Sequence, residues 1–182
     1  MIRTRQIEGI VLRRQNLGEA DRILTILSKE SGKIQVKAPG VRRIPSRRSA
    51  HIELLNLSRF SLYTSSRAFM PLVTEASTLD SFSSIKTSLS RIGAAFYICE
   101  LVNGLCPENQ DNVGVFFNLK STFSKLESMD SKLLVKNFER SLLEGLGFWA
   151  EAELLKTQDS SKIMERLMER RLKTTRIIPL FA

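Results

Sequence analysis

The segment GKIQVKAPGVRRIPSRR, residues 32–48, contains six lysines or arginines and no aspartate or glutamate. Cations of a single sign can neutralise the phosphates of a polyanion, whereas a generic solvated surface mixes both signs. Residues 1–79 hold 14 Lys or Arg against 6 Asp or Glu, and residues 80–182 hold 14 against 13. The net charge of +9 is thus concentrated in the first half, which predicts a polyanionic partner there.

The cations that we expect to contact a nucleic-acid backbone come from one strand, the loop after it and neighbouring strands. They are Lys33, Lys37, Arg42, Arg43, Arg47, Arg48, Arg13, Arg14 and Arg22. Pro39, Gly40 and Pro45 interrupt regular structure, so the loop can adapt to a strand of variable shape. The alternative is a solvated loop that only keeps the protein soluble. We predict sequence-independent, salt-sensitive binding, with about four to six phosphates giving a log–log salt slope of about −3 to −5.

The residues that could support catalysis or bind metal are few. His51 is the single histidine, so it lacks partners for a metal site or a proton relay. Glu19 and Asp21, one residue apart and followed directly by Arg22, predict a turn with a salt bridge. Cys99 and Cys106 form no CxxC pair and are expected to be buried, reduced thiols. With no Walker phosphate loop, GxSxG or HExxH motif, we expect neither an enzyme nor a cofactor or metal site.

The first 79 residues follow the two-residue period of strands. KIQVKAP places its apolar residues on one face and its polar residues on the other. GEADRILTILSKESG also fits a helical face, but its short length and its flanking glycines favour a strand followed by a hairpin turn. With the runs IEGIVLRRQN, IELLNLSRFSLYTS and AFMPLVTEAS, the segment predicts a five-stranded OB-type β-barrel.

The period changes near residue 80 to the three-to-four-residue spacing of amphipathic helices. Residues 84–105 predict a long first helix, which CPENQDN ends. Apolar spacing over 116–126 and 134–146 predicts two more, the latter closed by Gly147, and Ile163 and Leu167 predict a fourth. The expected fold class is α+β, with a barrel domain at 1–79 and a helical bundle at 80–182.

Several ordered segments resemble the RecO family of bacterial recombination mediators. EGIVLRRQNLGEADRILTILSKESGKIQVKAPGVRR is similar to the opening of that family, up to its GxRR ending. AAFYICELVNGLCPENQDNVGVFFNLKSTFSKLE is similar to its A-x-Y-x-x-E-L helix, acidic loop and F-x-x-L helix. NFERSLLEGLGF is similar to its F-E-x-x-L-L-x-x-x-G segment. The resemblance covers most of residues 5–150.

This resemblance implies an OB-fold followed by a helical domain, binding of single- and double-stranded DNA, and annealing of complementary strands. It implies that the protein acts with RecR to help RecA displace single-strand-binding protein (SSB). It also implies that the helical domain captures the acidic, apolar C-terminal tail of SSB. The candidates for the tail site are cations beside apolar side chains, although core packing is the favoured explanation for the aromatics. They are Phe116, Phe117, Lys120, Phe123 and Lys125.

The chain departs from the family after GLGF. Many RecO proteins carry four zinc-binding cysteines there, whereas WAEAELLKTQDSSKIMERL has none, and the chain ends sooner than usual. We therefore expect the zinc module to be deleted, along with any RecR contact that depends on it. MERRLKTTRIIPLF resembles the family's terminal segment.

Two other functions stay open from the residues alone. One is an RNA-binding OB-fold protein, because phosphates do not distinguish RNA from DNA. The other is an adaptor whose basic surface docks an acidic protein tail. Since no run approaches the length of a membrane span or a signal peptide, a soluble, intracellular protein is expected. The resemblance implies a cytoplasmic, nucleoid-associated bacterial protein.

Overall fold

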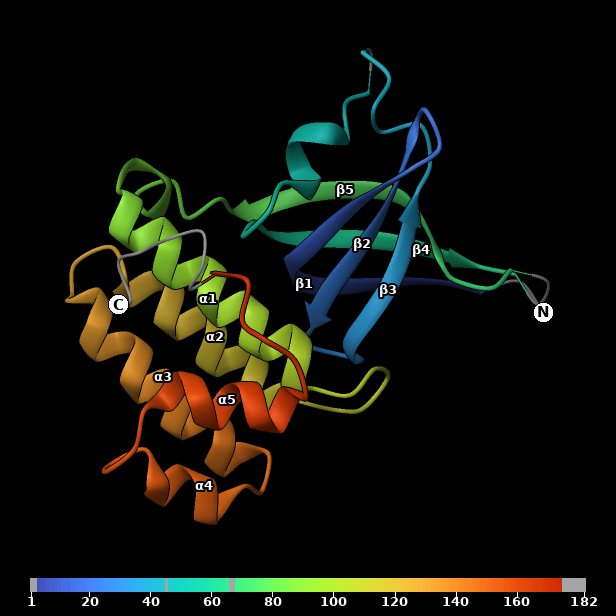
Figure 1. Cartoon of the computed structure of the whole chain (residues 1–182). Coiled ribbons are helices and arrows are strands. Elements are labelled where there is room, and N and C mark those ends of the chain that lie inside the picture. Colours follow the sequence, from blue (N-terminus) through green and yellow to red (C-terminus); the bar gives the residue numbers. More distant parts are fainter. Residues whose placement is uncertain (1–2, 45, 66–67, 175–182) are drawn as a thin grey trace. The chain divides into compact units, whose positions relative to one another are not determined.

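Five strands form a closed barrel in the order β1-β2-β3-β5-β4 (Figure 1). The computed structural model describes residues 3–44, 46–65 and 68–174. Neighbouring strands are antiparallel except for β3 and β5, which are parallel. This architecture confirms the predicted five-stranded OB-type barrel. The strands are β1 (Arg3–Leu17), β2 (Asp21–Ser28), β3 (Gly32–Ala38), β4 (Leu57–Thr64) and β5 (Leu72–Asp80).

The alternation predicted along β3 places its apolar side chains in the barrel core. Ile34, Val36 and Ala38 are buried. Across the antiparallel ladder, Val36 lies opposite Leu24 of β2 and Ile34 lies opposite Ile26. Because directly opposed residues share a face of the sheet, both strands contribute one side to the same interior. The core is therefore set by the two-residue period that the sequence displays.

The first residue of β3, directly after the β2–β3 turn, must be glycine. Gly32 has a φ of +60°, and a β-carbon there would lie 1.7 Å from the carbonyl oxygen of Gln110. No side chain fits at this close approach. The segment 107–112, which we predicted only as a break after the first helix, thus packs directly against the barrel.

The connection between β3 and β4 differs from the prediction. IELLNLSRFSLYTS suggested a strand beginning at Ile52, but β4 begins only at Leu57. A short 3-10 helix, η1 (Ser49–Ile52), precedes it, and Leu55 adopts a φ of 72°. Ile52 and Leu55 are both buried. An extended strand would send every second residue outward, so this compact connection buries two apolar side chains that a strand would separate.

The second half is helical, and four of its helices confirm the predicted ones. The first begins at Leu89 rather than at residue 84, because Ser88 is extended, with a ψ of 128°. The six-residue helix α4 was not predicted. Gly147, with a φ of +88°, follows the third predicted helix as expected. The elements are η2 (Ile85–Thr87), α1 (Leu89–Leu105), α2 (Val113–Lys125), α3 (Ser131–Gly145), α4 (Trp149–Leu154) and α5 (Ser160–Met168).

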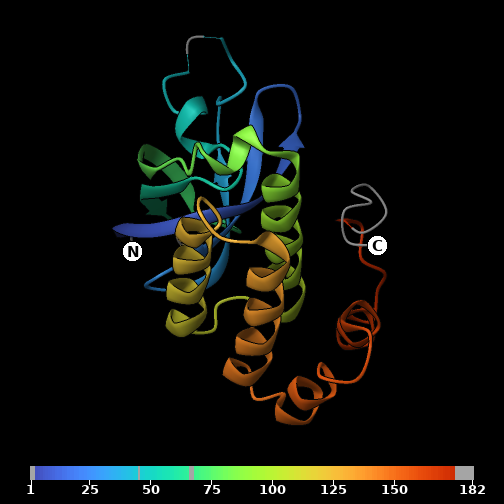
Figure 2. The ribbon, with the colours of Figure 1, turned by 90° about the vertical axis from the view of Figure 1, so that its left-hand side faces the viewer.

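The axes of α1, α2 and α3 are roughly aligned, as Figure 2 shows. None of the helices in the described ranges is long and apolar enough to span a bilayer. The chain divides into two compact units, one of Met1–Ser81 with Pro107–Phe116 and the other of Phe82–Cys106 with Phe117–Ala182. We call them the barrel unit and the helical unit. The division into functional domains at 1–79 and 80–182 stays a prediction.

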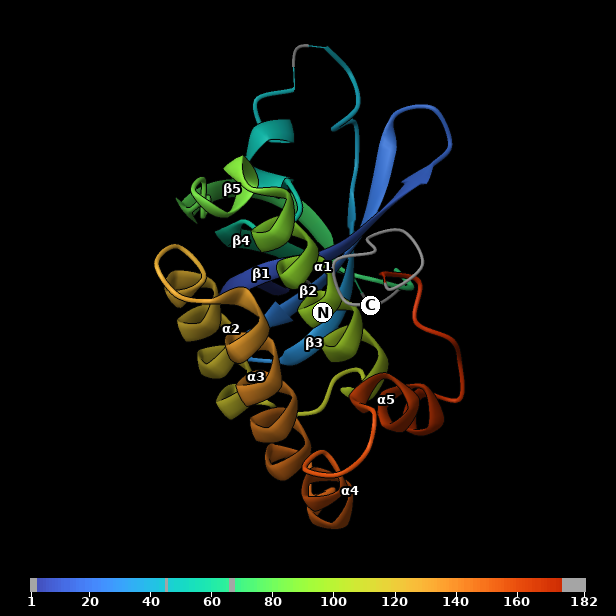
Figure 3. The same cartoon turned by 60° about the vertical axis from the view of Figure 1, so that its left-hand side comes forward.

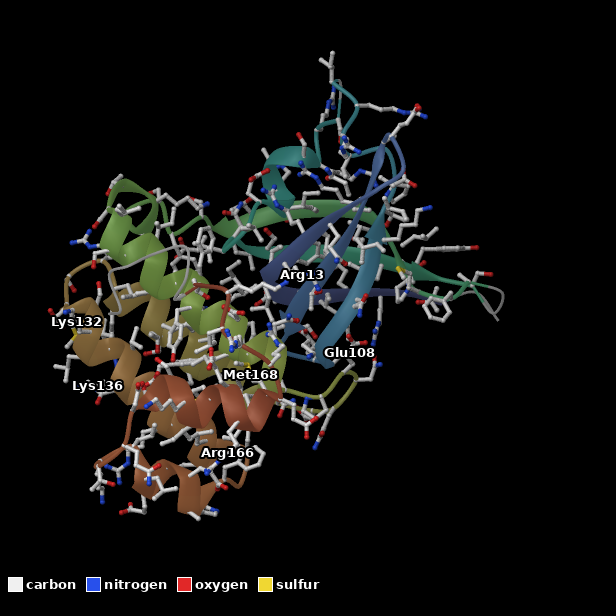
Figure 4. The ribbon with its side chains drawn as sticks, viewed as in Figure 1. Arg13, Glu108, Lys132, Lys136, Arg166 and Met168 are labelled. Carbon is white, nitrogen blue, oxygen red and sulfur yellow. The ribbon has the colours of Figure 1, made fainter. Side chains whose placement is uncertain are left out.

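Within the helical unit, Glu100 of α1 binds the segment that follows α5. Its carboxylate accepts hydrogen bonds from the backbone N–H groups of Lys173 (2.9 Å) and Thr174 (2.9 Å) and from the Thr174 hydroxyl. The Arg170 guanidinium lies 3.1 Å from the same carboxylate. Gly104 permits the approach, because a β-carbon there would lie 2.3 Å from the Met168 sulfur. Figure 3 shows α5 beside the C-terminal end of α1, and Figure 4 labels Met168.

Glu100→Ala should lower the free energy of unfolding of the helical unit by about 2–3 kcal/mol at neutral pH. Burial raises the pKa of Glu100, but the hydrogen bonds from Thr174 and Lys173 and the charge of Arg170 outweigh it, so the pKa is lowered from its usual 4.5. The stabilisation is therefore fully present above pH 4.5 and is lost as the pH falls through the lowered value. Denaturant unfolding against pH measures this.

The control for this experiment is Glu139→Gln. Glu139 is buried, and the Tyr97 hydroxyl donates to its Oε1 at 2.6 Å. Burial raises the pKa of this carboxyl, so its contribution has the opposite sign and is lost as the pH rises through the raised value. In the plot of unfolding free energy against pH, Glu139→Gln should remove the loss of stability at rising pH. It should leave unchanged the loss at acidic pH, the acidic limb, which we assign to Glu100. An acidic limb that survives Glu100→Ala would contradict the assignment to Glu100.

Candidate nucleic-acid interface

The paired arginines of β1 lie on opposite faces of the strand. A β-bulge between Val11 and Arg13 shifts the register with β2. After it, Arg13 lies opposite Thr25 and is exposed, whereas Arg14 lies opposite the core residue Leu24. Successive residues of a strand point to opposite faces, so only Arg13 belongs to the outer surface (Figure 4). Two adjacent arginines in the sequence therefore do not form one cationic surface.

Arg14 and Arg22 share a carboxylate partner. Arg14 forms an ion pair with Glu53, and the guanidinium of Arg22 lies 3.8 Å from the same carboxylate. Burial and the charge of Arg14 lower the pKa of Arg22. Glu53 follows η1 and so comes from far along the chain. These two predicted DNA contacts are already partly neutralised inside the protein, which leaves them less charge for a phosphate.

The two lysines of β3 have different environments. Lys33, Gln35 and Lys37 share the outer face, as the alternation predicted, but Lys33 is only 7% exposed. The N–H of Asn109 donates to the carbonyl oxygen of Lys33 at 2.8 Å, and the amide of Gln35 donates to Glu108 at 2.6 Å. The segment 107–112 thus lies along this edge of β3. Lys33, predicted as a DNA contact, is thus largely shielded from solvent, because a segment distant in sequence runs beside it.

Arg48 anchors the loop after β3. Its guanidinium donates to the carbonyl oxygens of Val73 at 2.5 Å and Pro39 at 2.7 Å. Pro39 begins the loop and Val73 lies near the start of β5, so Arg48 joins the loop to that strand. Its side chain is half-buried. Its donors face carbonyl groups, which makes Arg48 a residue that positions the loop.

The remaining cations of the loop are exposed. We call Arg42, Arg43 and Arg47 the loop arginines. Arg42 donates to the carbonyl oxygen of Gly18 at 2.7 Å, and its own N–H donates to Ala20 at 2.9 Å, so the loop lies against the β1–β2 turn (Figure 1). Throughout the described part of the chain, no carboxylate forms an ion pair with any loop arginine. These three side chains are therefore accessible to a partner.

Asp21 is the acidic residue that organises this end of the barrel. Its carboxylate accepts a hydrogen bond from the N–H of Gly40 at 2.8 Å and lies 2.8 Å from the ammonium group of Lys37. The hydrogen bond from Lys37 and that from Gly40 lower the pKa of Asp21, with a further contribution from the charge of Arg43. The predicted salt bridge at this turn exists, but with Lys37 rather than with Arg22.

Asp21→Asn should raise the affinity for DNA by about two- to fivefold, because it removes the negative charge beside Lys37 and Arg43. Asparagine retains an oxygen that can accept the N–H of Gly40, so the loop should keep its place. Measuring the affinity for DNA at fixed salt concentration tests this. Glu75→Gln on β5 is the control for the loss of an acidic charge. An unchanged affinity would mean that no phosphate approaches this end of the barrel.

The surroundings of His51, Cys99 and Cys106 indicate structural roles for these residues. The Thr78 N–H donates to Nδ1 of His51 at 3.2 Å. Cys99 and Cys106 are buried cysteines outside any disulfide, as predicted, and burial raises the pKa of Cys99. In residues 3–44, 46–65 and 68–174, no three His, Cys, Asp or Glu side chains are grouped to hold a metal ion.

The five candidates for a tail site divide by burial. Phe116 and Phe123 are buried, and the rings of Phe123 and Phe82 pack edge to face with centroids 5.4 Å apart. Core packing therefore explains these two aromatics. Phe117 is 50% exposed, and Lys120 and Lys125 lie on the same helix, α2. Only these three can meet a partner.

Comparison with known proteins gives a consistent result for both halves of the chain. Residues 1–82 match the family model described as "Recombination protein O N terminal", and residues 86–152 match "Recombination protein O C terminal". The chain belongs to the RecO family. The resemblance that the sequence motifs indicated is thus confirmed, and the OB-type barrel coincides with the N-terminal RecO segment.

Three relatives illustrate the extent of the match. The DNA repair protein RecO of Dehalococcoides mccartyi is 38% identical over 144 residues, 79% of this chain and 56% of that protein. The RecO of Roseiflexus sp. is 37% identical over 80% of this chain and 51% of its own length. That of Pelotomaculum thermopropionicum is 35% identical over 78% and 54% respectively. This RecO chain therefore spans about half the length of the curated relatives it matches.

Sequence reasoning missed three parts of the candidate interface: Asp21 as its organiser, Glu53 as a partner of arginines, and the segment 107–112 beside β3. An acidic residue directly after the β1–β2 turn was a visible signal for the first. Neither of the others had a local signal, because each depends on contact between distant segments.

Proposed function

We propose that this RecO chain binds the phosphate backbone of single- and double-stranded DNA through its barrel unit and acts without catalysis in recombinational DNA repair. The observation that carries this proposal is the group of loop arginines, which are exposed and form no ion pair with a carboxylate in the described residues. Arg13 on the outer face of the same barrel adds a fourth cation. The relatives' printed name, DNA repair protein, supports the biological setting.

The number of engaged phosphates is smaller than the sequence indicated. Lys33 is buried, Lys37 pairs with Asp21, Arg48 holds the loop, and Arg14 and Arg22 share Glu53. Three or four phosphates remain, which corresponds to a log–log salt slope of about −2 to −4. Such a contact surface is independent of sequence, because phosphate contacts position a protein without reading bases.

The proposed setting includes strand annealing and, together with RecR, loading of RecA onto DNA coated with SSB in the bacterial nucleoid. For the acidic, apolar tail of SSB we propose the exposed face of α2 formed by Phe117, Lys120 and Lys125. Its support is the combination of an accessible aromatic ring with cations one and two turns away. Phe116 and Phe123 have no part in this proposal.

Competition binding tests the proposal against RNA binding and tail docking. Labelled single-stranded DNA is bound at two salt concentrations and challenged with RNA of equal length and with an acidic tail peptide. We expect RNA to displace the labelled DNA no better than unlabelled DNA of the same length does, and the peptide to leave the DNA bound. Preferential displacement by RNA, or by the peptide alone, would overturn it. Annealing of SSB-coated complementary oligonucleotides then tests the activity, and its absence would reduce the proposal to DNA binding.

A further inference from the structure

Two large apolar side chains in the described part of the chain are almost fully exposed, and both lie on loops of the barrel unit. Phe69, between β4 and β5, is 99% exposed, and Ile44, beside Arg43, is 103% exposed. The next most exposed large apolar residue is Leu89 at 71%. Single exposed apolar residues are common, so exposure by itself indicates no function. What indicates a function is the position of Phe69 relative to the cations of the barrel unit.

The loop that carries Phe69 is tied to the cationic end of the barrel at its stem. Two residues after it, the carbonyl oxygen of Pro71 accepts the N–H of Lys37 at 2.9 Å, and Leu72 pairs with Lys37. Arg48 then joins Val73 to Pro39, the first residue of the arginine loop. The end of β3 is thus flanked by both loops (Figure 1). A strand with its phosphates on the loop arginines can continue across β3 toward Phe69.

An OB barrel presents its β2–β3 face and the loops that follow β1 and β4 to oligonucleotides. A fully exposed aromatic ring on the loop after β4 can stack on any base, since every base has a π-face. The bases of a duplex hide those faces. We infer that Phe69 stacks on an unpaired base, so that it distinguishes single-stranded from double-stranded DNA. This inference rests on the proposed backbone binding and extends it to the form of DNA preferred.

Three ligands with equal numbers of phosphates per strand separate stacking from phosphate binding: a single-stranded oligonucleotide, the same strand with abasic sites replacing its bases, and a duplex. Fluorescence anisotropy gives the affinity of each for the full chain. We expect the base-containing strand to bind at least about fivefold tighter than the abasic strand. Phe69→Ala should abolish that difference and leave duplex binding unchanged, while Phe69→Trp should retain it.

Ile44→Ala is the matched control, because Ile44 is equally exposed and lies among the loop arginines but has no ring. We expect it to retain the preference for bases. Because the Phe69 side chain is almost fully exposed, its replacement should leave the circular dichroism spectrum unchanged. Equal binding of the base-containing and abasic strands by the wild type, or equal losses for strand and duplex in Phe69→Ala, would overturn the inference. Failure of the wild type to bind any of the three would instead overturn the proposed function.

Discussion

Reversing the charges of Arg43 and Arg47 to glutamate should weaken DNA binding by about ten- to a hundredfold at low salt. Both side chains are exposed. Within the described residues, neither side chain forms a hydrogen bond or an ion pair that supports the fold. If each contacts one phosphate, the log–log salt slope should become shallower by about two. Affinity for single-stranded DNA across a salt series measures both effects, and the loss should be similar for strands of different sequence.

The control is the double variant Lys132→Glu, Lys136→Glu on α3, which makes the same change in net charge. Both lysines are exposed (Figure 4) and lie one turn apart on the helical unit. We expect the slope to stay near the wild-type value. If the two double variants weaken binding equally, net charge rather than the loop arginines determines affinity, and the proposed site is wrong. Circular dichroism confirms that each variant is folded.

Phe123→Ala should lower the free energy of unfolding of the helical unit by about 3–5 kcal/mol, because it leaves a cavity at a fully buried ring that packs against Phe82. Phe117→Ala, on the same helix, should cost less than about 1 kcal/mol, since half of that side chain is already in water. Urea unfolding followed by the helical circular dichroism signal measures both.

Variants of Phe117 and Phe123 also test the proposed tail site on α2. Phe117→Ala should weaken binding of an acidic, apolar peptide while the protein stays folded, and Lys120→Ala should do the same. Phe123→Leu, which keeps most of the buried volume, should bind the peptide as the wild type does. Peptide binding that survives Phe117→Ala but not Phe123→Leu would place the tail elsewhere. Similar stability losses for the two alanine variants would contradict the burial of Phe123.

Much of the fold could be predicted because the relevant signals are local. The alternation of Ile34, Val36 and Ala38 follows from the pleat of a strand, and the spacing in α1 and α3 follows from the turn of a helix. The start of β4 was wrong because Ile52 and Leu55 turn into the interior, which an apolar run does not reveal. The short α4 had no distinct period.

By itself the sequence determined the two structural periods, the family and the concentration of positive charge in the first half, all of which are properties of neighbouring residues. Only the tertiary structure decided which cations are available. Arg14 and Arg22 meet Glu53, and Lys33 lies beside the segment 107–112, because folding joins residues distant in the chain. The residue type determines whether a side chain is charged, but its exposure and its ion pairs depend on which residues pack against it.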